Sequence, residues 1–131
     1  MPKYYTGVDL GGTKIISGIV DADGKVIASK KILTNAIDGP LKVIERISES
    51  IEIAIEKAGL KLKDIKAIGI GAAGQIDLKK GVVLNAQNLY KWQNIPLKKK
   101  IEKKFNTPVF INNDVNMGTI GEFISGAGKK S

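Results

Sequence analysis

The sequence predicts an α/β fold in which a mixed β-sheet carries helices on both faces. Short segments rich in β-forming residues alternate with segments of helical periodicity. The first three β segments are joined by short glycine-containing turns, which favour an antiparallel arrangement. The later β segments are each separated by a helix, as crossover connections require. The expected order of elements is therefore β-β-β-α-β-α-β-α.

Five β segments follow from the pattern. The first ends at a Gly-Gly pair, and the turn between the second and third is the sequence Asp21-Ala22-Asp23-Gly24, whose residue types favour turns. The fourth segment is short and apolar, as expected of a buried strand. The expected strands cover residues 4–10, 15–20, 25–34, 67–71 and 109–111.

The clearest helix lies between Gly39-Pro40 and Gly59, because proline is favoured at the first helical position and glycine just past the last. Its apolar face is expected to contain Leu41, Ile44, Ile47, Ile51, Ala54, Ile55 and Ala58. A second, lysine-rich helix is expected to turn Leu97, Ile101 and Phe105 inward. A third is expected at residues 115–124. Residues 72–96 are expected to form a loop, with Trp92 as a core aromatic beneath it.

Composition limits the function classes. The 131 residues suffice for one domain, and 43% hydrophobic with 26% charged residues is typical of a globular protein. There is no apolar run of the roughly 18 residues that span a bilayer and no apolar leader, so we expect a cytoplasmic protein without a membrane partner. Histidine and cysteine are absent, which excludes zinc ligands of these types, disulfides and a histidine-based triad.

The formal charge of +8 raises the question of a nucleic-acid partner. Arg46 is the only arginine among the 21 basic residues. Arginine is the usual residue for reading bases and phosphates, and the lysines of residues 98–104 fit the solvated face of a helix. We therefore expect a charged surface and no nucleic-acid partner.

The first candidate for chemistry is Asp9-Leu10-Gly11-Gly12-Thr13-Lys14, where one expected strand ends and the next begins. Adjacent glycines let a backbone approach a phosphate closely and aim its N–H groups at the oxygens. Thr13 adds a hydroxyl and Lys14 a charge, and Asp9 is an oxygen ligand suited to Mg²⁺, directly or through water. A plain glycine-containing hairpin is the structural alternative.

The second candidate is Asn112-Asn113-Asp114-Val115-Asn116, directly after an expected buried strand. A helix N-cap would explain one of these polar side chains, but four occur in five positions. At the end of a strand, such side chains can bind sugar hydroxyls while a carboxylate accepts a proton. We favour the functional interpretation.

Three further segments complete a resemblance to the ROK family, which includes bacterial glucokinases. Residues 69–77 resemble its Gly-x-Gly-x-Pro-Gly-x-x-Asp segment, and residues 88–97 its Asn-Leu-x-x-Trp…Pro-Leu stretch. Residues 113–128 resemble Asn-Asp-x-Asn…Gly-Glu…Gly-Ala-Gly. The Asp9 motif resembles the phosphate motif of the sugar kinase and actin superfamily. Two departures are Ala73 and Gln87, each at a position where the family commonly has proline.

The resemblance implies the ribonuclease-H-like fold of actin and hexokinase. It also implies that residues 1–131 are the amino-terminal domain of a two-domain, ATP-dependent hexose kinase, with glucose the expected sugar. Asp114 would be the general base, Gly74, Asn113 and Asp114 would bind the sugar, and Asp9, Gly11, Gly12, Thr13 and Lys14 would bind ATP with Mg²⁺ at Asp9.

The rest of such a kinase has no counterpart in this sequence: the second phosphate loop, the acidic-Gly-His sugar site and the zinc motif. We therefore expect the fragment alone to be inactive and a homo-oligomer to form through the full-length protein or an exposed interdomain surface. Two alternatives are the sugar-sensing domain of a ROK repressor and a stand-alone interaction domain. The repressor is less favoured, because the phosphate motif begins at Asp9 and leaves no room before it for a DNA-binding module.

Overall fold

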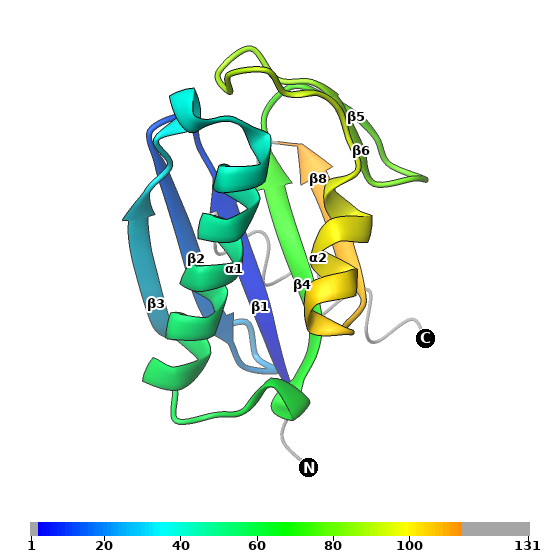
Figure 1. The fold of residues 1–131 in the computed structure, drawn as a ribbon. Coiled ribbons are helices and arrows are strands. Elements are labelled where there is room, and N and C mark those ends of the chain that lie inside the picture. The colour runs from blue at the N-terminus through cyan, green and yellow to red at the C-terminus, as the bar shows by residue number, and fades with distance from the viewer. Residues whose placement is uncertain (1–2, 114–131) are drawn as a thin grey trace.

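The computed structural model describes residues 3–113, and its centre is a five-stranded mixed sheet with the strand order β3-β2-β1-β4-β8 (Figure 1). The pairs β1–β2 and β2–β3 are antiparallel, whereas β1–β4 and β4–β8 are parallel. The strands are β1 (Tyr4–Leu10), β2 (Lys14–Val20), β3 (Val26–Leu33), β4 (Ile65–Ala72) and β8 (Val109–Asn113). The expected antiparallel start and crossover continuation are thus present.

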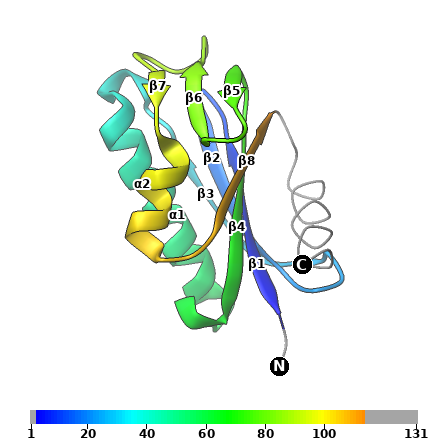
Figure 2. The same cartoon turned by 90° about the vertical axis from the view of Figure 1, so that its right-hand side faces the viewer.

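Both described helices, α1 (Pro40–Lys57) and α2 (Leu97–Phe105), pack on the same face of this sheet (Figure 2). The core forms between them and the inward side chains of the strands, among them Val8, Ile70 and Ile111. The helix expected at residues 115–124 lies outside the described residues, so the expectation of helices on both faces is not tested. Within residues 3–113 no helix is long and apolar enough to span a membrane.

The inward faces of the two helices largely agree with the sequence pattern. Leu97, Ile101 and Phe105 of α2 are all buried, as expected. Leu41 of α1 is 66% exposed, contrary to the expectation, because it lies in the first turn, at the end of the apolar stripe. Trp92 is 1% exposed and belongs to the core, as expected.

The expectation of a loop over residues 72–96 was wrong. A three-stranded antiparallel sheet forms there, with the order β5-β6-β7 and strands Gln75–Asp77, Val82–Asn85 and Gln93–Ile95. Each strand has only three or four residues, too few for a clear period-two pattern. Short 3₁₀ turns, η1 (Ala36–Asp38) and η2 (Leu62–Asp64), precede α1 and β4. In Figure 1 the small sheet lies beside the end of β8.

Candidate functional site

The two motif regions meet at the edge of the sheet where the parallel strands β1, β4 and β8 end. Asp9 pairs with Gly71, and Gly71 pairs with Asn112 on the far side. Neighbouring strands lie about 4.8 Å apart, so Asp9 and Asn112 are about 10 Å apart along the row. Because Val8 and Leu10 face the core, Asp9 lies on the other face of the sheet, as does Asn112. The carboxyl ends of parallel strands are the usual place for a ligand in such sheets.

Residues 9–14, the glycine hairpin, connect β1 to β2. The N–H of Gly11 donates to the carbonyl of Lys14 at 3.0 Å, which closes the turn. A Cβ at Gly12 would lie 2.7 Å from the backbone oxygen of Asn88, so this position has no room for a side chain. Thr13 and Lys14 are exposed at the tip, whereas Asp9 is half-buried. The hairpin is therefore a tight backbone turn with accessible polar side chains.

A support of this hairpin was missed by the sequence analysis. Thr34 is fully buried, and its hydroxyl donates to the carbonyl of Gly11 at 2.8 Å while its N–H donates to the carbonyl of Thr13 at 2.9 Å. Arg46 in turn donates from Nη1 to the carbonyls of Thr34 (2.8 Å) and Asn35 (3.1 Å). These bonds tie the hairpin to α1. The only sequence signal for this support was that Arg46 is the sole arginine of the chain.

The Arg46 guanidinium is itself held by a carboxylate. Its Nη2 lies 2.5 Å from Oδ2 of Asp38 in η1, and the arginine side chain is largely shielded from solvent. Two carbonyls and a carboxylate are thus served by one planar fork, which a lysine ammonium cannot reproduce. Arg46 therefore acts on the hairpin indirectly, as a positioning residue.

We expect Arg46→Lys to lower the free energy of unfolding by about 1 kcal/mol, since at least one hydrogen bond is lost. It should also increase amide hydrogen exchange at Thr34 and Gly11, whose N–H groups hold the hairpin. Lys57→Ala is the matched control, because Lys57 also reaches from α1 to a strand carbonyl, that of Ser29. Unchanged exchange at Thr34 in Arg46→Lys would contradict the positioning role.

Asn112 and Asn113, at the end of β8, are held to the turn between β4 and β5. Nδ2 of Asn113 donates to the carbonyl of Gly74 at 2.6 Å, and the N–H of Asn113 donates to Oδ1 of Asn112 at 2.8 Å. Gly74 has φ +110°, and a Cβ there would overlap the backbone oxygen of Asn85. The structure thus brings together Gly74 and Asn113, both predicted to bind a sugar. Asp114 lies outside the described residues.

The donor set at this edge fits a hard cation held together with phosphate. Within residues 3–113 no group of three or more acidic residues could hold a metal ion by itself. Mg²⁺ is commonly bound by one or two carboxylates, waters and substrate phosphates, so the single carboxylate of Asp9 beside the glycine hairpin fits such a site. The close approach at Gly12 is to the backbone oxygen of Asn88, so packing on residue 88 already requires a glycine there.

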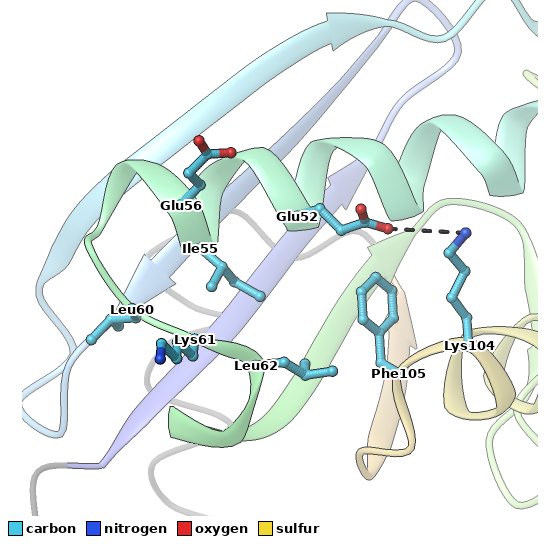
Figure 3. A pocket seen from close by; sticks show the side chains of 8 residues that line it. All are labelled: Glu52, Ile55, Glu56, Leu60, Lys61, Leu62, Lys104 and Phe105. Carbon is cyan, nitrogen blue, oxygen red and sulfur yellow. Dashed lines mark ion pairs between the residues drawn. The ribbon is translucent and has the colours of Figure 1, made fainter.

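An apolar cavity lies away from these residues. It has a volume of about 490 Å³, and its apolar lining residues are Ile55, Leu60, Leu62 and Phe105 (Figure 3). Glu52 and Lys104, which also line it, form an ion pair of 3.9 Å. Residues 60–62 lead into the start of β4, so this cavity lies at the sheet edge opposite the strand ends. It contains none of the predicted site residues.

The sequence model of the ROK family matches residues 5–131. The chain is 37% identical over 123 residues to a glucokinase of Streptomyces coelicolor, covering 94% of this chain and 36% of the relative. It is 38% identical over 116 residues to a xylose repressor of Caldicellulosiruptor bescii, covering 88% and 29%. The chain therefore spans about a third of the length of these relatives.

Solved structures agree with the sequence relatives. A ROK hexokinase from Thermus thermophilus superposes with a TM-score of 0.77 at 33% identity, covering 86% of this chain and 36% of that one. A ROK family glucokinase from Streptomyces griseus, in complex with glucose and AMPPNP, superposes with a TM-score of 0.76 at 37% identity, covering 86% and 34%.

Proposed function

Because the chain belongs to the ROK family, we propose that it is the amino-terminal domain of a two-domain, ATP-dependent hexose kinase with glucose as acceptor. One observation carries this proposal: the glycine hairpin and the pair Asn112-Asn113 lie at the ends of the two strands that pair with β4. A phosphate site and a sugar site have to be adjacent for phosphoryl transfer.

The proposed roles combine the family resemblance with the contacts described above. Asn113, tied to Gly74, would orient the sugar, and Asp114, the next residue, would accept the proton of the attacking hydroxyl. The N–H groups and the Thr13 hydroxyl of the glycine hairpin, with Lys14, would bind phosphate oxygens. Asp9 would hold Mg²⁺, directly or through water, and a bound Mg²⁺ neutralises charge on the transferring phosphate.

A coupled assay of glucose phosphorylation tests this proposal on the full-length protein and on the 131-residue chain. The full-length protein should turn over at about 1–100 s⁻¹, the ordinary range of kinases, and the isolated chain should show no turnover, because the donor and acceptor have to be held between two domains. Turnover by the isolated chain in that range would contradict the two-domain requirement. If the full-length protein phosphorylated no hexose with ATP, the proposed kinase activity would be contradicted.

A sugar-sensing repressor is the second candidate, favoured by the 38% identity to the xylose repressor. A sensing domain needs the sugar contacts but not the phosphate hairpin. Sugar binding without phosphorylation, combined with sugar-dependent DNA binding by the full-length protein, would support this candidate. A full-length protein that binds no sugar and no DNA would favour the third alternative, a non-catalytic interaction domain.

A further inference from the structure

Three exposed apolar side chains gather where β3 leads through η1 into the first turn of α1. Among the large hydrophobic residues of the described part of the chain, the most exposed are Ile37 (72%), Leu41 (66%) and Leu33 (62%). All three fall within residues 33–41 and are called the apolar patch below. Single exposed apolar side chains are normal on a protein surface, but a group of them indicates a surface that contacts another.

The apolar patch lies at the same edge of the sheet as the candidate site. β3 is antiparallel to β2, and β2 is antiparallel to β1, so β3 ends at the edge where β1, β4 and β8 end. Leu33 pairs with Lys14, the last residue of the glycine hairpin. Figure 1 shows η1 and the start of α1 at this edge. Any surface that covers the patch would therefore also lie next to the hairpin.

The backbone that carries the apolar patch is held in place. The guanidinium of Arg46 donates to the carbonyls of Thr34 and Asn35, which lie between Leu33 and η1. The N–H of Asp38 donates to the carbonyl of Asn35 at 3.0 Å, and the Asp38 carboxylate pairs with Arg46. A surface that is already ordered loses little entropy when another surface packs on it.

The charges around the apolar patch are paired with one another. Residues 33–46 contain two basic and two acidic side chains. Arg46 pairs with Asp38, and Lys42 pairs with Glu45 at 3.6 Å. This segment therefore has no net charge with which to attract a polyanion or an acidic partner. Charged residues are depleted at the centre of protein interfaces, so the patch fits an apolar protein surface.

We propose that the apolar patch is covered by an apolar surface of the second domain of the full-length protein, when that domain closes over the glycine hairpin. This inference rests on the two-domain organisation of the proposed function. The chain corresponds to 36% of the length of the Streptomyces coelicolor glucokinase, so a full-length protein of that size has ample further chain to supply the covering surface. Burial of the patch would then favour the closed state, in which water is kept from the transferring phosphate.

Methyl NMR with a soluble gadolinium chelate tests the inference. The δ1 methyl groups of isoleucine are labelled in the 131-residue chain and in the full-length protein with glucose and a non-hydrolysable ATP analogue. The chelate should strongly relax the Ile37 methyl signal in the 131-residue chain, and most of this relaxation should be lost in the full-length protein. Ile27 is the matched reference, because it is 41% exposed and lies near the start of β3, at the opposite edge. Its relaxation should not change.

The outcomes separate this inference from the proposed function. Equal relaxation of Ile37 in both proteins would overturn the inference, even if the full-length protein phosphorylates glucose. Protection of Ile37 in a full-length protein that phosphorylates no hexose would support the inference and contradict the kinase. Protection that is already present in the 131-residue chain and grows with its concentration would show that a second copy covers the patch, which would overturn the second domain as its partner.

Ile37→Ser in the full-length protein should lower kcat/KM for glucose roughly 10-fold, the loss expected when one large apolar side chain is no longer buried on closure. The same change should leave the urea midpoint of the 131-residue chain unaltered, because Ile37 is exposed there. Leu62→Ser is the matched control, since Leu62 is an exposed leucine at the opposite edge of the sheet. It should keep the wild-type kcat/KM. Wild-type kcat/KM in Ile37→Ser, or an equal loss in both variants, would overturn the role of the patch.

Discussion

Replacing Asp114, the proposed general base, with asparagine in the full-length protein is expected to lower kcat by about 100-fold or more while changing sugar affinity much less. Asparagine keeps the shape and most of the hydrogen bonding of aspartate but cannot accept the proton of the attacking hydroxyl. A positioned general base contributes about 10²–10⁴-fold to such a reaction. A loss confined to kcat is the result expected when an interaction of the transition state is removed.

The competing interpretation of Asp114 as a helix N-cap makes the opposite prediction, because asparagine caps about as well as aspartate. Asp77→Asn is the matched control. The Asp77 carboxylate accepts hydrogen bonds from the N–H groups of Lys79 and Lys80, a structural role that asparagine should preserve. Steady-state kinetics with glucose should show a much lower kcat for Asp114→Asn than for Asp77→Asn. A near-normal kcat in Asp114→Asn would show that Asp114 has only a structural role.

Much of the main sheet could be predicted from the sequence because its signals are local. The strand at residues 4–10 has the predicted bounds, and α1 begins at the predicted proline and ends two residues before the predicted glycine. Alternation and terminal residue types determine such elements within one segment. The small sheet of residues 75–95 escaped prediction since its strands are too short to show a period.

The candidate site, like the fold, could be predicted only in part. The glycine hairpin and Asn113 could be found because their residue types are unusual at a strand end. Thr34 and Arg46 could not, since side-chain bonds to backbone carbonyls have no sequence pattern and join residues 11 to 23 positions apart. A cavity beside the β4–β5 turn was equally hidden, because it depends on how residues 73–75, 85, 87 and 88 fold together.

Gly74→Ala is expected to lower the free energy of unfolding of the 131-residue chain by about 3 kcal/mol. Two costs combine here. At φ +110° an alanine is strained, by about 1–2 kcal/mol, and its Cβ would overlap the backbone oxygen of Asn85, an overpacking that typically costs about 1–3 kcal/mol. Equilibrium unfolding in urea measures the loss.

Gly59→Ala separates the two costs, because Gly59 has φ +72° but no atom within 4 Å of the place that a Cβ would take. That variant should lose only about 1 kcal/mol, the strain alone. Since the carbonyl of Gly74 accepts the hydrogen bond of Asn113, relief of the overlap by movement of the turn should also shift the Asn113 amide resonance. Equal losses in the two variants, with Asn113 unmoved, would show that the close packing of Gly74 on Asn85 does not hold the asparagine in place.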